Sequence, residues 1–144
     1  MKKFEATLKQ FEKALKSFKE VLKLQKSDVV RDAAIKRFEL TLDLSWKMLK
    51  VFLEDKMGLL CTSPKEFFRE AYRQGIFKYD EAWLTFVDLK NETVHTYNEK
   101  TAERIFSQVP DAANHFEFLV DSIKKRLKKQ VVSHKRKKDR AQDS

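Results

Sequence analysis

Residues 2–22 read KKFEATLKQFEKALKSFKEVL, and the spacing of apolar side chains in this stretch decides the fold. The apolar residues recur at alternating steps of four and three: Phe4, Leu8, Phe11, Leu15, Phe18 and Leu22. Such steps place side chains on one face of an α-helix, because the helix repeats about every 3.6 residues. The pattern predicts a helix over roughly residues 3–26 whose apolar face must pack against other helices.

A second long helix is predicted after Ser27 and Asp28, which can cap its first turn. Its apolar face consists of Ala34, Ile35, Phe38, Leu42, Ser45, Leu49 and Phe52, with Trp46 and Met48 beside it. Gly58 is expected to end this helix, since glycine readily adopts the left-handed conformation found at helix C-termini.

The next helix has a strong N-terminal signal in Ser63, Pro64 and Glu66. The Ser63 hydroxyl can accept from a backbone N–H three residues later, proline fits the first turn, and the glutamate can bond back to the cap. This helix is predicted to be short and to end at Gly75.

Two further helices complete the chain. Asp80 can cap a helix that extends to about Val94, and Asn98 can cap another that begins at Glu99. Pro110 is expected to kink or split this last helix, because proline removes a backbone donor and crowds the preceding turn. The five segments predict an all-α fold, an up-and-down antiparallel four-helix bundle with an additional short helix.

The composition agrees with one helical domain. The chain has 144 residues, the size of an ordinary domain, and only two glycines and two prolines, which excludes a sheet-rich fold with many tight turns. Its single cysteine cannot form an internal disulfide, the N-terminus lacks an apolar signal region, and no stretch has the character of a membrane span. We therefore expect a cytoplasmic protein.

The positive charge lies almost entirely at the C-terminal end. The formal net charge is +9, and residues 124–140 contain ten Lys and Arg residues against one acidic residue, Asp139. We therefore divide the chain into a helical bundle domain, residues 1–123, and a basic C-terminal helix end and tail, residues 124–144, expected to be partly disordered. The tail can attract RNA or another polyanion through counterion release, and a solvated helix end is the alternative.

The fourth predicted helix contains the candidate chemistry. Trp83, Val87, Lys90, Val94 and Tyr97 continue one stripe, so Lys90 takes an otherwise apolar position and requires a charged partner. Trp83, like Trp46, is expected to serve packing alone.

The adjoining face of that helix carries Asp88, Asn91, Glu92 and His95, which combine carboxylates, an amide and an imidazole. Histidine exchanges protons near neutral pH, a neighbouring carboxylate or amide can fix its tautomer, and a lysine nearby can hold a phosphate. The alternative is an ordinary solvated helix face.

Three motifs resemble the nucleotidyltransferase substrate-binding family, the HepT-like proteins of the wider HEPN group, and the resemblance covers about residues 4–123. The motifs are Arg37–Lys47 (RFELTLDLSWK), Ser63–Glu66 followed by Arg69–Ala71 and Gly75, and the set Asn91, His95, Thr96 and Tyr97. The third motif usually reads Arg-Asn, three residues, then His-x-Tyr.

This resemblance implies a helical bundle that forms a homodimer and pairs with a separate small nucleotidyltransferase. In some such toxin–antitoxin pairs the helical member cleaves RNA with Arg and His from each chain, and the partner neutralises it by transferring AMP to the motif tyrosine. By position, His95 would be the general acid or base, Asn91 its support and Tyr97 the AMP acceptor. Lys90 replaces the motif arginine, and lysine lacks the planar fork that grips a phosphate from two sides.

Helix geometry sets a condition on this motif. On an unbroken helix Tyr97 would point about 200° away from His95, so the two side chains can meet only if the helix ends near Thr96 or a second subunit contributes. The alternative for Tyr97 is an aromatic that completes a packed stripe in the core or an interface.

The chain lacks the Gly-Ser loop and paired acids of a nucleotidyltransferase, a phosphate-binding glycine-rich loop and a zinc-ligand spacing. We therefore expect no cofactor in this chain, with ATP and Mg on the partner transferase alone. The sequence leaves three hypotheses: a non-catalytic substrate-binding partner subunit, a metal-independent endoribonuclease toxin, and an interaction protein that binds through its basic tail.

Overall fold

The computed structural model describes the backbone of residues 2–143 and the side chains of residues 3–129. The chain forms α1 (Lys2–Leu22), α2 (Asp28–Met57), α3 (Pro64–Arg73), α4 (Ala82–Glu92), the 3₁₀-helix η1 (Thr93–His95) and α5 (Glu99–Asp143). No strand occurs in the described part of the chain, so the prediction of an all-α fold is confirmed.

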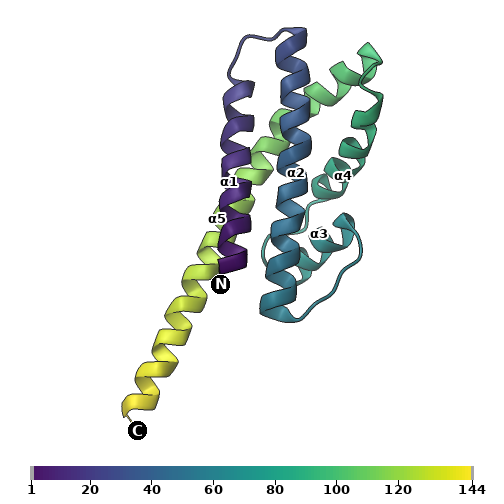
Figure 1. Cartoon of the computed structure of the whole chain (residues 1–144). Helices are drawn as coiled ribbons and strands as arrows, with labels where there is room; N and C mark the ends of the chain where they lie inside the picture. Colours follow the sequence, from purple (N-terminus) through teal and green to yellow (C-terminus); the bar gives the residue numbers. More distant parts are fainter. Residues whose placement is uncertain (1, 144) are drawn as a thin grey trace.

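The long helices form the frame of the molecule (Figure 1). Helices α1 and α2 pack side by side in opposite directions, and α5 packs against both of them. Helices α3 and α4 contact each other and lie against α2 on the side away from α1. The end of α4 and the start of α5 therefore meet at one end of the bundle.

The predicted helix signals act at the boundaries of α2 and α3. The Ser27 hydroxyl accepts from the Val30 N–H, and Gly58 ends α2 with a φ of 65°. The Ser63 hydroxyl accepts from the Glu66 N–H, while the Glu66 carboxylate accepts from the Thr62 N–H. These side chains satisfy backbone donors that the helix cannot satisfy itself.

Helix α1 ends at Leu22, earlier than predicted, because no buried apolar residue follows. Leu24 is exposed, so a further turn of this helix would have buried no apolar side chain. Of the two effects predicted for Pro110, a kink or a split, the split is wrong, since α5 is one continuous helix. Pro110 lies on its exposed side, where water can reach the backbone carbonyl that proline leaves without a donor.

Aromatic rings fill the centre of the bundle. Phe116 of α5 is fully buried, and its ring contacts rings from three other helices: Phe11, Phe18, Phe38, Trp83 and Phe86. Trp83 stacks between Phe68 and Phe77, and Trp46 stacks on Phe67. Both tryptophans thus have the packing role expected from the sequence.

The C-terminal part of α5 extends past the ends of the other helices (Figure 1). Its backbone is helical to Asp143, and its side chains from residue 130 onward, like all of Ser144, lie outside the described residues. Partial disorder of residues 124–144 therefore stays a prediction. None of the described helices combines the length and apolar character that crossing a membrane requires.

Candidate functional site at the α4–α5 turn

Helix α4 ends before the motif histidine. The Thr93 hydroxyl donates to the Lys90 carbonyl at 2.6 Å, and the backbone tightens into η1. The Asn98 side chain then accepts from the Lys100 and Thr101 N–H groups and caps α5. Threonine favours this ending because its hydroxyl bonds the local backbone in place of a continuing α-helix.

The early end of α4 breaks the predicted apolar stripe. Val94 and Tyr97 were expected to continue the face of Trp83 and Val87, but their exposed fractions are 71% and 83%. The prediction was wrong for these two residues because η1 and the turn after it no longer follow the period of an α-helix. The structure therefore places both side chains on the surface of this chain.

His95 and Tyr97 meet across the turn. The Tyr97 hydroxyl lies 3.4 Å from His95 Nδ1, and the ring centroids are 5.9 Å apart with the ring planes at 79°. The helix ends close enough to Thr96 to satisfy the condition set by the sequence. An imidazole nitrogen beside a phenol can exchange the phenolic proton, so the two groups can act as one chemical unit.

Lys90 faces away from this pair, toward α2. Its ammonium nitrogen lies 3.6 Å from Asp43 Oδ1, an atom that also accepts from Trp46 Nε1 at 3.2 Å. The charged partner that the lysine required is therefore Asp43, which sequence reasoning did not identify. The signal was available, because Asp43 is a carboxylate within the Arg37–Lys47 motif.

The other polar residues of α4 form separate contacts. Asp88 pairs with Lys65 of α3 at 2.7 Å, and Glu92 pairs with Arg104 of α5. Asn91 is exposed, and no hydrogen bond among the described side chains joins it to His95. The expected cluster of acid, amide and imidazole is thus divided, and the contact that remains at the histidine is Tyr97.

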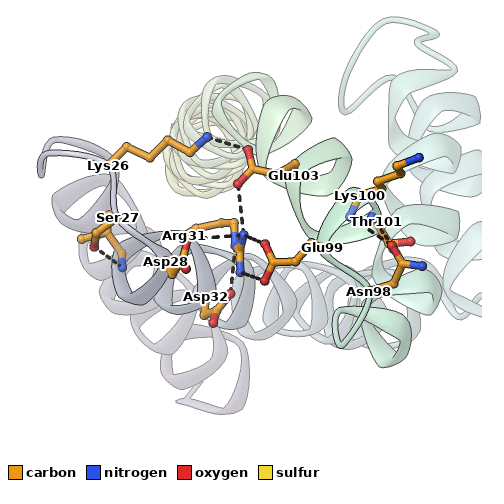
Figure 2. A network of polar contacts seen from close by, with 11 residues as sticks. Lys26, Ser27, Asp28, Arg31, Asp32, Asn98, Glu99, Lys100, Thr101 and Glu103 are labelled. Atoms are coloured by element: carbon orange, nitrogen blue, oxygen red, sulfur yellow. Dashed lines mark hydrogen bonds and ion pairs between the residues drawn. The ribbon is translucent and has the colours of Figure 1, made fainter.

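Arg31 contacts the first turns of α5, just after the α4–α5 turn, and was missed in the sequence (Figure 2). Its guanidinium bonds Glu99 and Glu103 on the first turns of α5, and these bonds raise the pKa of Arg31. The same arginine holds the pKa of the Glu99 carboxyl below its usual range. The sequence feature that could have identified Arg31 is its place on the core face of α2, because Arg31, Ile35 and Phe38 follow the same four-three spacing.

A second polar pair lies at the other end of α4. His115 Nε2 is 2.7 Å from Asp80 Oδ2, and Nδ1 is 2.8 Å from the Asp111 carbonyl oxygen. Both nitrogens face acceptors, so this geometry suits the doubly protonated imidazolium. The pair lines a cavity of about 320 Å³ with Phe77, Lys78, Tyr79, Trp83, Asn114 and Phe118. His115 thus links α5 to the segment before α4.

This pair should make stability depend on pH. Burial lowers the pKa of His115, but the bonds to Asp111 and Asp80 outweigh it and leave the pKa above its ordinary value of 6.5. A raised pKa means that the contribution is present below pH 6.5 and is lost as pH rises through the folded-state value. We expect the melting temperature difference between wild type and His115→Gln to be largest near pH 5.5 and smaller near pH 9.

The Asp80 carboxyl sets the lower limit of that window. Burial raises its pKa, but the bonds from the Ala82 N–H and from His115 outweigh it and leave the pKa below its ordinary value of 3.8. The stability that the Asp80 carboxylate contributes is therefore lost as pH falls through this lowered folded-state pKa. Asp80→Asn, which can still accept from Ala82, is the matched variant and should remove part of the same pH dependence, because the contacts of His115 with Asp111 remain. An unchanged difference for His115→Gln from pH 5.5 to pH 9 would contradict this assignment.

Among the described residues, no group of three or more His, Cys, Asp or Glu side chains is placed to hold a metal ion. The chemistry that these residues themselves provide at the α4–α5 turn is therefore that of an imidazole, a phenol and a nearby guanidinium–carboxylate network.

Comparison with known proteins adds a family match and a similar protein of known sequence. Residues 3–129 match the family described as "Nucleotidyltransferase substrate binding protein like". Over 105 residues the chain is 30% identical to a Haemophilus influenzae protein named "Probable ribonuclease HepT", an alignment that covers 69% of this chain and 70% of that protein. The family match ends at residue 129, within α5.

Two solved structures share the fold. A crystal structure of a Thermus thermophilus protein is 44% identical with a TM-score of 0.73, covering 77% of this chain and 96% of that one. A Haemophilus influenzae protein is 27% identical with a TM-score of 0.69, covering 81% and 98% of the two chains. The second structure is described as revealing the fold of a substrate-binding domain of a nucleotidyltransferase.

Proposed function

Because the chain belongs to the nucleotidyltransferase substrate-binding protein-like family, as its three motifs suggested, we propose that it is the partner subunit of a two-component minimal nucleotidyltransferase. In this assignment a separate small transferase supplies the catalytic acids, Mg and ATP, and the present chain supplies the acceptor surface. We assign it to a toxin–antitoxin type pair, as a homodimer in the cytoplasm.

The observation that carries this proposal is the exposed contact between His95 and Tyr97. The Tyr97 phenol is 83% exposed at the end of the bundle, so another protein's active site can reach it. Its hydroxyl already lies 3.4 Å from an imidazole nitrogen. A phenol that serves as acceptor needs both accessibility and a group to take its proton.

The residues at the turn define a simple transfer step. The Tyr97 oxygen forms a bond to the α-phosphorus of the nucleotide held by the transferase, and the bond between that phosphorus and pyrophosphate breaks. The phenolic proton passes to His95 Nδ1, which lies 3.4 Å from the hydroxyl. The pyrophosphate leaves with the negative charge of the broken bond.

Incubating the chain with a small nucleotidyltransferase from the same genome, Mg and ATP tests this function. Intact-mass spectrometry should show the addition of one adenylyl group, and peptide mapping should place it on Tyr97. A complex that forms without adenylylation would retain the partner assignment and exclude Tyr97 as the acceptor.

A second candidate, an endoribonuclease of the HEPN type that needs no metal, is supported by the histidine and by the basic C-terminal segment. His95 is exposed and can act as general acid or base on a phosphodiester, with Asn91 and Lys90 of the same motif beside it in sequence. Residues 124–140 are strongly basic and can hold RNA through its phosphates. AMP on Tyr97 would then block the histidine and neutralise the toxin.

RNA cleavage by purified protein tests the second candidate. For a nuclease, His95→Ala is expected to lower the rate by about 100-fold or more, because it removes the general acid or base. Lys90→Arg is expected to raise the rate by restoring the planar phosphate-binding fork, provided that the side chain turns from Asp43 toward the RNA. The rate should be followed by gel electrophoresis of a mixed RNA at several salt concentrations.

Two controls make the cleavage measurement decisive. Lys50→Arg makes the same change at an exposed position of α2 and should leave the rate unchanged. A chain truncated after residue 129 should bind RNA more weakly and with a smaller salt dependence. Cleavage by His95→Ala at the wild-type rate would contradict the assignment of His95 as general acid or base. Absence of cleavage by both wild type and Lys90→Arg would exclude the nuclease, and substrate binding would remain as the assigned function.

A further inference from the structure

A buried arginine joins the start of α2 to the first turns of α5, which follow the candidate site in the chain. Arg31 is only 3% exposed, although it lies on the first turn of α2. Its guanidinium bonds Glu99 at 2.7 and 3.3 Å, Glu103 at 3.0 Å and Asp32 at 3.1 Å, with Asp28 at 3.6 Å (Figure 2). Four carboxylates from two helices thus surround one guanidinium. Among the described side chains, one further cation contacts these carboxylates.

That further cation is Lys26, which bonds Glu103 at 2.5 Å. Two positive charges therefore face four negative charges, so this cluster of side chains is negatively charged overall. Carboxylates from the first turns of α2 and α5 would repel each other without the guanidinium. Lys26 is exposed and contacts a single carboxylate, so it cannot replace the bidentate contact that Arg31 makes with Glu99.

The α5 residues that Arg31 holds are next to the candidate site in the chain. Glu99 follows Tyr97 by two residues, and the intervening Asn98 caps α5 through its side chain. Figure 2 shows Asn98 and Glu99 together at the start of this helix. Because the turn is so short, the position of Glu99 restricts where the phenol can lie.

The other side of the turn is fixed independently. The Thr93 hydroxyl closes the last turn of α4, and Glu92 pairs with Arg104 one turn further along α5. With that side held by α4, the contact between His95 and Tyr97 depends on how firmly the start of α5 is held. Besides the apolar packing of Ala102 and Ile105, the described residues provide one buried charged side chain for this purpose, Arg31 of α2.

We propose that Arg31 is a positioning residue for the candidate site: by fixing Glu99 and Glu103, it keeps the Tyr97 hydroxyl on the His95 imidazole. The functional meaning of this role rests on the proposed function, whereas the positioning itself is a property of the isolated chain. Arg31 touches neither ring and takes no proton. It acts through the first turns of α5.

A double-mutant cycle read by NMR tests the positioning on the full chain without partner or RNA. Tyr97→Phe removes the hydroxyl and should shift the ring signals of His95 in an otherwise wild-type chain. In an Arg31→Gln background the same substitution should shift those signals by less than half as much. Arg31→Lys should recover part of the effect, because it restores the charge without the fork.

Arg37→Gln is the matched control. Arg37 lies on the same helix and donates to the Ser17 carbonyl of α1 at 2.8 Å, so its loss weakens helix packing away from the turn. The effect of Tyr97→Phe should be unchanged in that background. Equal effects in the wild-type and Arg31→Gln backgrounds would overturn the proposal, and so would an equal reduction by Arg37→Gln, which would indicate general loosening.

Amide hydrogen exchange gives a second readout of the same turn. Exchange at Lys100 and Thr101, whose N–H groups bond Asn98, should accelerate about tenfold or more in Arg31→Gln and not in Arg37→Gln. If Arg31→Gln does not fold, Glu99→Gln keeps the test open, since Glu99 is exposed and Arg31 retains Glu103. Glu99→Gln should also reduce the effect of Tyr97→Phe, and an unchanged effect would overturn the proposal. Because neither measurement needs activity, failure here is distinct from failure of the proposed function.

Discussion

Replacing Phe116 by Ala is expected to lower the free energy of unfolding by about 3–5 kcal/mol, the range typical of buried Phe→Ala substitutions. The ring is fully buried and contacts five other aromatic rings from α1, α2 and α4. Alanine would leave a cavity that three helices must close together, so relaxation can recover only part of the loss. Urea unfolding followed by circular dichroism measures the change directly.

Phe118→Ala is the matched control, two residues further along the same helix. Phe118 is 58% exposed, so the same truncation removes little buried surface and should change stability by about 0.5 kcal/mol or less. Both variants place alanine in a helix, so the difference between them isolates the cavity from helix propensity. A loss below about 1 kcal/mol for Phe116→Ala would contradict the central packing role of this ring.

The size of this effect follows from how the bundle is held together. Helix α5 is connected to α4 by a short turn, and the Phe116 ring lies at the place where α5 meets rings of the other helices. A stability of about 5–15 kcal/mol is usual for a domain, so one such ring is a substantial fraction of the total. Loss of this packing would also loosen α5 against α4 and disturb the turn between them.

Local sequence patterns predicted most of the fold. The four-three spacing of α1 is reproduced in the structure, where Phe4, Phe11 and Phe18 are buried. Ser27 and Ser63 cap the helices they were expected to cap. These signals act within one or two helical turns, so a sequence read without its tertiary context already contains them.

Contacts between distant residues were not predictable in the same way. Arg31 and Glu99 are 68 positions apart, and the pairing of Lys90 with Asp43 joins two different helices. Which face of α4 turns toward α2 depends on the packing of the whole bundle. The sequence showed that Lys90 needed a partner and offered Asp43 within the Arg37–Lys47 motif as one candidate, but only the packed helices show that the two side chains meet.

The errors at Pro110 and Val94 have opposite causes. Proline was given too much weight as a helix breaker, because an exposed position allows water to satisfy the carbonyl that it leaves unpaired. Thr93 was given too little weight, because its hydroxyl ends α4 through a local backbone bond. The early end of α4 brings His95 and Tyr97 together, so their contact lies where the backbone departs from a regular α-helix.

Tyr97→Phe is expected to abolish AMP transfer to this chain by its partner transferase. Phenylalanine keeps the ring at the turn and removes only the oxygen that would form the bond to phosphorus, so the loss should be complete. The chain, the transferase, Mg and radiolabelled ATP should be incubated together, and label on the chain should be followed by electrophoresis. Intact-mass spectrometry should then show a single adenylyl group on wild type and none on the variant.

The chain offers two matched controls, because it contains only three tyrosines. Tyr72 and Tyr79 are 45% and 56% exposed, and their rings contact each other away from the α4–α5 turn. Tyr79 also donates its hydroxyl to Glu81, so its phenol already has a carboxylate partner. Tyr72→Phe and Tyr79→Phe should retain full labelling, and loss of labelling in either would contradict the assignment of Tyr97.

His95→Gln separates accessibility from proton transfer at the same site. If exposure of Tyr97 alone makes it an acceptor, this variant should be labelled at the wild-type rate, because the phenol remains on the surface. If the imidazole takes the proton, labelling should slow by about 100-fold, the lower range for loss of a general base. We expect the slower rate, because the Tyr97 hydroxyl lies 3.4 Å from His95 Nδ1 and the short turn between α4 and α5 limits its movement away.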